Sequence, residues 1–547
     1  LLRMCMRSPA SLICAMAMAF YVNAKSSCLL DNVTMTTTGV AVFARGDCAL
    51  AAVNNSNITA GTYAVTTNAA SSDNYNPVFN IVGSTLKGSS PVLVNVPCEL
   101  KIENSTINGS MHGVIVRGGT ANITGSTITQ TYTDDDYQQM ADYFNKRDWG
   151  SGNMINLGAL IVGNKHATSY QYPSAVTVTD TVIKTAGAHA DLFPAIYTYA
   201  NNAADKGVNL SIGGDKTNVS GKVVKGNKEY NTISISGGTF SDLSCVKYMT
   251  ADAKVIVDLN GKTVNGGADF YAGDLTIKNG TVEGTVWVNA STTDAKYNHL
   301  TVAADATIGK GDYAVVLYQA MVGANNFGST IDVYGKLNGI LWVMGNIKTD
   351  LKAAQNPCVI NVHDGAEIED KTDATNVGIA LNGAAILNVD KAMIAGSTGI
   401  EVRAGQMTLN GATVTGKAAS TVVKPNDSGV TTDGAGIAVA QHTTKLPIEV
   451  TINSGAISGY TAFYESNPQN NAAEDLAKIN IAVKGGEFKA INGGTNTVYS
   501  KDKTGFITGG HFSSDPTAYL AAGKYVIKSD KAGYTYAVTG TKPEKTP

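Results

Sequence analysis

Short runs of alternating apolar and polar residues recur along the chain and are separated by corners rich in Asn, Gly and Asp. The segments VIVRG (114–118), ANITG (121–125), VTVTD (176–180) and LTIKNG (275–280) show this alternation. A period of two over four to six residues is typical of a β-strand with one buried face. The pattern therefore predicts many short strands and very little helix.

The strands belong to a repeating unit of about twenty to thirty residues. The stretch Asn104-Ser-Thr-Ile107 returns as Gly125-Ser-Thr-Ile128, and Ile107 marks a position that recurs along the chain. Equivalent residues are Met35, Ile58, Leu86, Ile107, Ile128, Ile183, Phe240, Val282, Ile308, Ile368, Ile394, Val414, Ile457, Phe488 and Phe512, with Leu337 as a weaker member.

A corner precedes nearly every one of these positions. Asn, Gly or Asp stands three residues before them, as at Asn32, Asn104, Gly237, Asp305 and Gly485, Lys391 and Ser454 being exceptions. These residue types tolerate a positive φ, so a sharp bend is expected there. The N-x-S/T matches that result, such as Asn57 and Asn104, are interpreted as turn chemistry and not as glycosylation sites.

A unit of this kind cannot bury its own apolar face, so successive units must stack and share one core. The sequence therefore predicts an all-β fold, a right-handed parallel β-helix (solenoid). Two Gly-Gly-x-Phe-Ser corners, in 235–249 and 507–520, each precede a short helix-like piece and divide the chain. We predict a first β-helix section at 1–241, a second at 242–510, a capping module at 511–538 and a linker at 539–547. A cap is expected because an open β-helix end exposes unpaired backbone groups.

The first residues allow two interpretations. Arg3 and Arg7 followed by LICAMAMAFYVNA (12–24) have the pattern of a signal peptide ending at Ala24. The same stretch aligns with the next repeat, which favours a first coil. Its apolar run is too short to span a membrane, so no membrane span is predicted.

Several segments resemble the recurrent modules of large surface or secreted β-helical proteins of gut Firmicutes. They are VIVDLNGKTV (255–264), GGTFSD (237–242), GGHFSSDPTAYL (509–520) and the stretch 149–181. The resemblance covers most of residues 100 to 540 and implies a pectin-lyase-like fold. It also implies an adhesin-like protein with an extracellular or cell-surface location.

Composition narrows the function. Only 16% of the residues are charged and the net charge is −3, which argues against a nucleic-acid binder, because such proteins carry a basic face. The seven cysteines form no CxxC pair. Cys28, Cys48, Cys98 and Cys358 precede repeat positions and are interpreted as buried thiols in one slot of successive coils, with a disulfide framework as the alternative.

Catalytic patterns known on β-helices are missing from the sequence. There is no Gly-His-Gly, Arg-Ile-Lys or GxSxG, and the seven histidines fall in different units. Arg45, Arg117 and Arg403 occupy the same strand end in distant coils, where we expect solvated side chains. No cofactor is expected, and the sequence favours a protein that is not an enzyme.

One segment interrupts the repeat and supplies the candidate binding residues. The insertion 131–153 carries three consecutive carboxylates followed by aromatic residues, and the loop YQYPS (170–174) lies close to it in sequence. Aromatic faces stack on sugar rings and carboxylates bind their hydroxyls or Ca²⁺. The predicted ligand-binding residues are Asp134, Asp135, Asp136, Tyr137, Tyr143, Trp149, Tyr170 and Tyr172. The alternative is that the insertion packs its aromatic side chains on the flank of the β-helix.

These observations support one main hypothesis and two alternatives. The first is a non-enzymatic, monomeric adhesin or stalk module that presents loops to a glycan or to a host or bacterial surface protein. The second is a polysaccharide lyase or glycoside hydrolase that uses Asp134 to Asp136 as acid, base or metal ligands. The third is a phage tailspike-like protein, which would form trimers.

Overall fold

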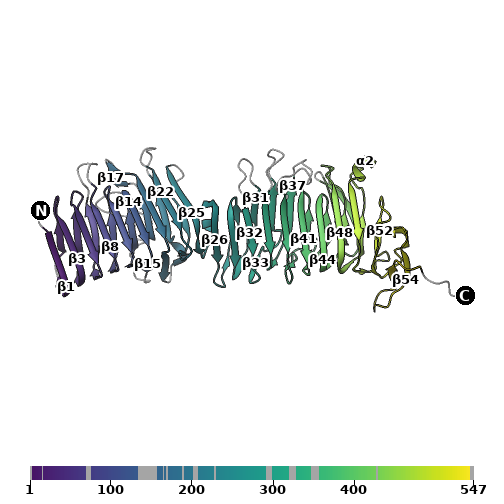
Figure 1. Cartoon of the computed structure of the whole chain (residues 1–547), viewed down its shortest axis with the longest axis horizontal. Coiled ribbons are helices and arrows are strands. Elements are labelled where there is room, and N and C mark those ends of the chain that lie inside the picture. Colours follow the sequence, from purple (N-terminus) through teal and green to yellow (C-terminus); the bar gives the residue numbers. More distant parts are fainter. Residues whose placement is uncertain are drawn as a thin grey trace. The chain divides into compact units, whose positions relative to one another are not determined.

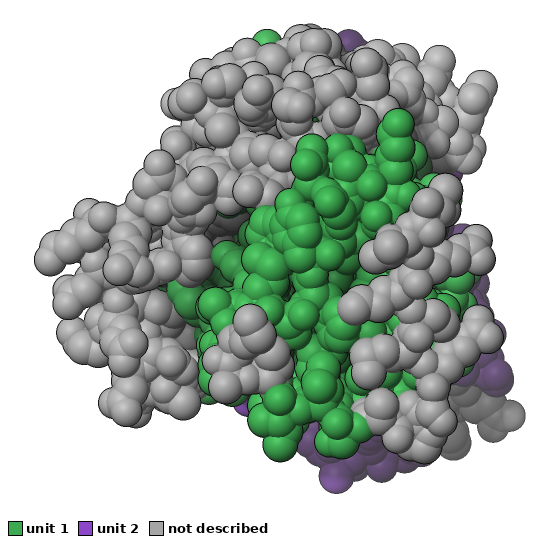
Figure 2. Space-filling view, turned by 90° about the vertical axis from the view of Figure 1, so that its left-hand side faces the viewer, with its two compact units in different colours: residues 1–257 green, residues 258–547 purple. Residues whose placement is uncertain are grey.

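A computed structural model describes residues 3–14, 17–68, 76–132, 157–163, 165–167, 170–187, 190–200, 207–226, 230–290, 298–319, 328–345, 357–426 and 429–542. The chain divides into two compact units, residues 1–257 and 258–547. Figure 1 follows the strands of each unit, and Figure 2 shows unit 1 in green from its β1 end. The units are considered one at a time below.

Each coil of unit 1 is a turn of three strands. In one coil β11 (Glu99–Glu103) and β12 (Thr106–Gly109) meet at a two-residue corner, and β13 (His112–Val116) closes the turn. The next coil starts with β14 (Gly119–Thr124), which pairs with β11 in parallel and in register. Because each strand pairs with its equivalent in the next coil, the chain is a parallel β-helix, and the predicted solenoid fold is confirmed.

Strands of unit 1 fall into three rows. The first row is β1 (Arg3–Cys14), β3 (Ser27–Thr37), β5 (Leu50–Asn54), β8 (Val78–Val82), β11, β14, β19 (Ser174–Thr179), β22 (Val208–Gly213) and β25 (Asn231–Phe240). The next strand, β26 (Met249–Asp258), pairs with β25 mainly through Gly237–Phe240. The second row is β6 (Asn57–Ala60), β9 (Thr85–Gly88), β12, β15 (Thr127–Tyr132), β20 (Val182–Gly187) and β23 (Asn218–Ser220), continued by parts of β3 and β25. The third row is β2 (Met18–Val22), β4 (Val40–Arg45), β7 (Val65–Asn68), β10 (Val92–Val94), β13, β16 (Gly158–Gly163), β21 (Ile196–Tyr199) and β24 (Val223–Lys225). Outside the rows lie β17 (Lys165–Ala167), β18 (Tyr170–Gln171) and the 3₁₀ helices η1 (Ala190–Leu192) and η3 (Leu243–Tyr248).

Unit 2 repeats this arrangement. Its first row is β29 (Gly273–Lys278), β32 (Asn298–Val302), β35 (Ser329–Val333), β38 (Cys358–Val362), β41 (Ala385–Asp390), β44 (Gly405–Gly416), β48 (Ile448–Gly459) and β50 (Ile479–Val483). Its second row is β27 (Thr263–Val264), β30 (Gly280–Val282), β33 (Ala306–Ile308), β36 (Lys336–Leu337), β39 (Glu367–Ile368), β42 (Met393–Gly396), β51 (Glu487–Ala490) and β53 (Gly510–Phe512), joined by parts of β44 and β48. Its third row is β28 (Ala268–Phe270), β31 (Val286–Ala290), β34 (Tyr313–Gln319), β37 (Ile340–Gly345), β40 (Ile379–Leu381), β43 (Ile400–Val402), β47 (Ala435–Val439), β49 (Thr461–Glu465) and β52 (Val498–Ser500). The remaining elements are the hairpin β45 (Val422–Asn426) and β46 (Gly429–Asp433), α2 (Ala473–Leu476), η5 (Thr517–Tyr519), β54 (Tyr525–Lys528) and β55 (Tyr536–Thr539).

The recurring apolar position forms a continuous stack inside each unit. In unit 1 the residues in register are Met35, Ile58, Leu86, Ile107, Ile128, Ile183, Val219 and Phe240. In unit 2 they are Val264, Val282, Ile308, Leu337, Ile368, Ile394, Val414, Ile457, Phe488 and Phe512. Leu337 is a full member of the stack and is 2% exposed, while the sequence pattern missed Val219 and Val264.

The corners adopt the left-handed backbone that the sequence predicts, with corrections at some positions. Asn32 and Asn104 have φ values of 57° and 48°. Lys391, an exception by residue type, also has a φ of 48°. At the Gly-Gly corners the second glycine takes the positive φ, as Gly238 does at 113°. Asp305 does not adopt a positive φ; its carboxylate instead accepts a hydrogen bond from the backbone N–H of Asn279 at 3.0 Å.

Buried hydroxyl groups tie the corners of successive coils together. In six successive coils of unit 1 the residue after the corner position is Ser56, Ser84, Ser105, Ser126, Thr181 or Thr217, and each is buried. The Ser105 hydroxyl accepts a hydrogen bond from the backbone N–H of Ser84 at 3.1 Å, and Ser126 does the same for Ser105. This ladder explains why the Ser of the Asn-Ser-Thr-Ile echo recurs, because a buried N–H without a partner would be destabilising.

An antiparallel hairpin covers the last coil of unit 2. β53 pairs in parallel with β51 on one side and antiparallel with β55 on the other, and β55 also pairs with β54. The short helix-like pieces expected after the two Phe-Ser corners are the 3₁₀ helices η3 and η5. Before η5, the Asp515 carboxylate accepts the backbone N–H of Thr517 at 2.9 Å.

The cysteines and arginines depart from parts of the sequence interpretation. Cys28, Cys48 and Cys98 are buried as expected, but Cys28 is in register with Ala51, so the thiols do not share one slot. Burial, with a smaller contribution from the nearby Asp47 carboxylate, raises the pKa of Cys48 to about 12.

The prediction of solvated arginines was wrong for two of the three. Arg117 and Arg403 are 2% and 6% exposed, because Asn95 and Glu401 accept their hydrogen bonds.

Within the described part of the chain, none of the helices has the length and apolar character that crossing a membrane requires.

Candidate functional site

Most of the residues that the sequence singled out lie outside the described part of the chain. These are Asp134, Asp135, Asp136, Tyr137, Tyr143 and Trp149. Tyr170 lies in β18, whose partner is β17. Tyr172 is 2% exposed and its β-carbon lies beside Gly118 in unit 1. The proposed binding role of the insertion therefore stays a prediction.

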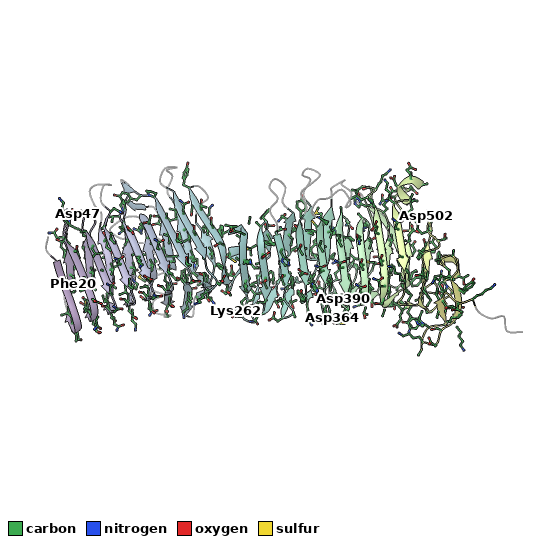
Figure 3. The ribbon with its side chains drawn as sticks, in the orientation of Figure 1. Phe20, Asp47, Lys262, Asp364, Asp390 and Asp502 are labelled. Carbon is green, nitrogen blue, oxygen red and sulfur yellow. The ribbon has the colours of Figure 1, made fainter. Side chains whose placement is uncertain are left out.

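The outer faces of the β-helix differ in chemistry, and the difference points to another candidate site. The outward positions on the first three strands of the first row of unit 2, β29, β32 and β35, are polar, and they are Asp274, Thr276, His299, Thr301, Thr330 and Asp332. On β31, β34 and β37 of the third row the outward positions are mostly aromatic or apolar, Asn289 excepted, while Asp269 of β28 and Glu401 of β43 carry carboxyl groups. Figure 3 places Asp364 and Asp390 at the opposite side of unit 2 from Asp502, which follows β52 of the third row.

We define the aromatic face as the outward surface of β31, β34 and β37. Within β31 the alternation VWVNA buries Val286 and Val288 and turns Trp287 outward. The same alternation in β37 turns Trp342 outward. The residue in register between the two tryptophans is Val316 of β34, so the three side chains form one row across the strands.

Two tyrosines complete the aromatic face. The ring of Tyr313 stacks on Trp342 with 4.8 Å between centroids and 20° between planes, and Tyr313 is 37% exposed. The ring of Tyr318 meets Trp287 edge-on with 6.4 Å between centroids. Val316 is fully buried although its register position faces outward, so the exposed part of this face is provided by the aromatic side chains beside it.

Buried hydrogen bonds hold the strands that carry this face. The Asn298 side-chain amide is fully buried and donates to the backbone carbonyls of Asn289 and Phe270, at 2.8 Å and 3.4 Å. The Thr285 hydroxyl donates to the carbonyl of Tyr313 at 2.6 Å. The aromatic residues thus lie on regular strands whose ends are held by hydrogen bonds, which favours a preorganised surface.

The third row of unit 1 has a similar outward face. Leu93, Ile115 and Ile161 lie in register on it, and Tyr197 and Tyr199 pack against them. Burial raises the pKa of both tyrosines. This face is more covered than the aromatic face, and it shows that an apolar outer surface on the third row is common to both units.

A histidine–aspartate cluster lies on the polar first row of unit 2. The Nε2 atoms of His299 and His363 donate to the two oxygens of the Asp332 carboxylate at 2.6 Å and 2.7 Å. The His363 ring stacks on Tyr334 with 3.9 Å between centroids. Partial burial would raise the pKa of Asp332, but hydrogen bonds from His363, Asn361 and His299 outweigh burial and hold this pKa below its ordinary value.

The two histidines of this cluster fall in different repeat units, as the sequence indicates, but the structure brings them to one carboxylate. His299, Asp332 and His363 come from consecutive coils, and stacking brings them together. Both imidazoles form hydrogen bonds with the carboxylate. Among the described residues, no group of three or more His, Cys, Asp or Glu side chains has an arrangement that could bind a metal ion.

A hollow of about 460 Å³ lies on the second row of unit 2. Its lining includes Lys336, Glu367, Glu369, Lys371 and the exposed Met393. Lys336 pairs with Glu367 at 3.0 Å, and Lys417 at its rim pairs with Glu369. Because these lysines and glutamates already pair with one another, few charged groups in the hollow remain to bind a ligand.

Glu401 is a buried carboxyl on the third row. It is 1% exposed, pairs with Arg403 at 2.8 Å and accepts the backbone N–H of Thr432 from β46. Burial raises the pKa of Glu401 to about 7, against the opposing effects of Arg403 and Thr432. A carboxyl so enclosed does not meet a substrate, so its role is structural.

Comparisons of the chain with protein-family models, with curated proteins and with solved structures found no match. The structure alone therefore defines the class, which is a parallel β-helical repeat protein with a small antiparallel closure.

Sequence reasoning overlooked the aromatic face, although a signal for it existed. Two of the three tryptophans stand in the matching stretches VWVN and LWVM, both with the ring between two inward aliphatic residues. Aligning those stretches by coil would have placed Trp287 and Trp342 on one face.

Proposed function

We propose that this chain is a non-enzymatic binding module, an adhesin or stalk of a bacterial cell-surface or secreted protein, that binds glycan on the aromatic face. The carrying observation is the row formed by Trp287, Val316 and Trp342 on three adjacent strands, with Tyr313 stacked at its edge. Aromatic rings give a large, rigid contact area, and tyrosine and tryptophan add hydrogen-bond donors. The cell-surface setting is supported by the resemblance to β-helical proteins of gut Firmicutes.

The geometry favours binding over catalysis. The aromatic face is broad, and its outward residues on β31, β34 and β37 are uncharged in the described ranges. Glycoside hydrolysis requires two carboxyl groups about 5 to 10 Å apart across the bound sugar. Among the described residues of the same row, only one exposed carboxyl, Asp269, stands beside the aromatic face, in register with Trp287. Glu401, further along the row, is enclosed by Arg403 and β46.

The test is glycan binding by the whole chain on an array and by affinity electrophoresis, with the double variant Trp287→Ala/Trp342→Ala. We expect this variant to weaken binding by about ten-fold or more, since each ring provides about 1 kcal/mol beyond its buried area. The matched control is Tyr334→Ala, which removes a 41% exposed aromatic ring from the polar face. Its binding should equal that of the wild type.

Three outcomes would contradict the proposal. They are absence of glycan binding by the intact chain, equal binding by the double variant, and release of reducing ends or unsaturated uronates from polysaccharides. A parallel variant, Asp134→Asn/Asp135→Asn/Asp136→Asn/Trp149→Ala, tests the residues predicted from the sequence. Loss of binding only in this second variant would move the site to the insertion.

A further inference from the structure

The spacing and charge of the aromatic face also restrict the class of glycan. Parallel strands lie about 4.8 Å apart, so Trp287 and Trp342, two strands apart, are about 10 Å from one another along the coil axis. This separation exceeds the length of a single sugar ring. A ligand that contacts both tryptophans must therefore be a chain of several sugars that runs across the strands.

The charge of the surface argues for an uncharged chain. On the third row from β28 to β40, the described outward positions carry a single charged side chain, Asp269. Binding to carboxylate or sulfate groups normally uses Arg or Lys. The single charge here is negative, so a polyuronate or a sulfated glycan would gain no ion pair and would be repelled by Asp269.

Two polar side chains border the apolar row of the aromatic face. One pleat further along the strands, the outward row contains Asn289, Tyr318 and Met344, in register with one another. The Asn289 amide and the Tyr318 hydroxyl thus border the apolar row of Trp287, Val316 and Trp342. An apolar row beside a polar edge matches the ring faces and the hydroxyls of a neutral sugar.

From these features we infer that the aromatic face binds an extended, uncharged polysaccharide laid along the coil axis, with separate sugar rings on Trp287 and on the Trp342–Tyr313 pair. The inference rests on the proposed function and adds the ligand's charge, length and direction. A protein partner is the competing occupant, and the test below separates it.

The experiment measures binding of the whole chain by calorimetry to two sets of ligands. The first set is neutral oligosaccharides of increasing length from xylan, β-glucan and β-mannan. The second set is polygalacturonate, alginate and heparin. We expect binding to at least one neutral series, with affinity rising about ten-fold or more until the chain spans both tryptophans and levelling off beyond that length.

Single variants test the two contact points. Trp287→Ala and Trp342→Ala should each reduce the affinity for long neutral chains and remove the dependence on length, because one contact remains. Trp342→Phe should retain most of the affinity, which distinguishes ring stacking from a folding defect. Asp269→Asn should leave neutral binding unchanged and should not create binding to polyanions by itself.

The outcomes separate this inference from the proposed function. If the chain binds polyanions and Trp342→Ala abolishes that binding, the inference that the ligand is uncharged is wrong, but the glycan-binding function is not contradicted. If neutral oligosaccharides bind with an affinity that does not depend on their length, the inference that one chain contacts both tryptophans is wrong. Failure to bind any glycan, or retention of only a protein partner, would overturn both.

Discussion

The Ser105 hydroxyl shows how a single buried polar group supports a coil. It accepts the backbone N–H of Ser84 at 3.1 Å and donates to the carbonyl of Glu103 at 2.8 Å, and Ser105 is 3% exposed. The same arrangement recurs at the neighbouring corners, so each hydroxyl accepts a hydrogen bond from a buried backbone N–H of the coil before it.

We predict that Ser105→Ala lowers the free energy of unfolding by about 1–2 kcal/mol, because the N–H of Ser84 would stay buried without a partner. Chemical denaturation followed by circular dichroism measures the change. The control is Asn122→Ala, at an exposed position of β14, which should change stability by less than about 0.5 kcal/mol. Equal effects of the two substitutions would show that the ladder does not stabilise the coil.

Glu401 gives the second prediction at this scale, a dependence of stability on pH. Its folded pKa of about 7 lies above the ordinary value of 4.5, so the folded state holds the proton more tightly. Its contribution is therefore fully present below pH 4.5 and is lost as pH rises through 7. The loss is on the order of 3 kcal/mol.

Glu401→Gln should flatten this part of the profile while keeping an acceptor for Thr432. Denaturant midpoints between pH 4.5 and 8 provide the measurement, with the exposed Glu474→Gln as control. If the wild type and Glu401→Gln lose stability in parallel over this interval, the assignment of the pH dependence to Glu401 is wrong.

At the scale of the element, the corner is the feature that turns one strand into the next. Lys391 stands at a corner with a φ of 48°, where a β-carbon is strained, and its charge makes one long ion pair with Asp364, at 3.8 Å. Glycine removes that strain without changing the path of the chain.

We predict that Lys391→Gly raises the free energy of unfolding by about 0.5–1 kcal/mol. The control Lys489→Gly, at an exposed position inside β51, should lower it by a similar amount, because glycine weakens a strand interior. Thermal and chemical denaturation of both variants give the comparison. A stability loss at position 391 would mean that the ion pair outweighs the strain.

The corner residues also show how far the sequence predicts the elements. Alternation and the Asn or Gly before Ile107 locate most strands of the first two rows, because both features follow from local backbone geometry. Val219 was missed because Lys216 stands where the corner residue was expected. In the same way, a Gly-Gly pair does not reveal which glycine takes the positive φ.

The third row was harder to predict, and the candidate site lies on it. Its strands do not all keep one distance from the second row: Trp287 and Trp342 stand five positions after Val282 and Leu337, but Val316 stands eight positions after Ile308. Trp287 and Trp342 come together only once the coils are stacked. His299, Asp332 and His363 meet for the same reason, although no local spacing relates them.

At the scale of the whole molecule, stability and solubility depend on how the stack ends. The closing hairpin of unit 2 covers the last coil, where Phe512 stacks on Phe488 with 4.9 Å between centroids. Without β53 to β55, the edge of β51 and the ring of Phe488 would face solvent.

Deletion of residues 509–547 is therefore expected to cause association that increases with concentration, because an uncovered strand edge pairs with other chains. Size-exclusion chromatography with light scattering measures it. Deletion of 540–547 alone, which leaves β55 intact, is the control and should match the full chain. A monomeric protein after the longer deletion would show that the hairpin is not a cap.

The in-register pairing of β11 with β14 makes neighbouring coils interchangeable at their edges. A gene segment that encodes one complete turn can thus be duplicated or lost by unequal recombination without disturbing the turns beside it. Each turn added between β31 and β37 would lengthen the third row of unit 2 by one strand, so related genes that differ in copy number would encode β-helices of graded length.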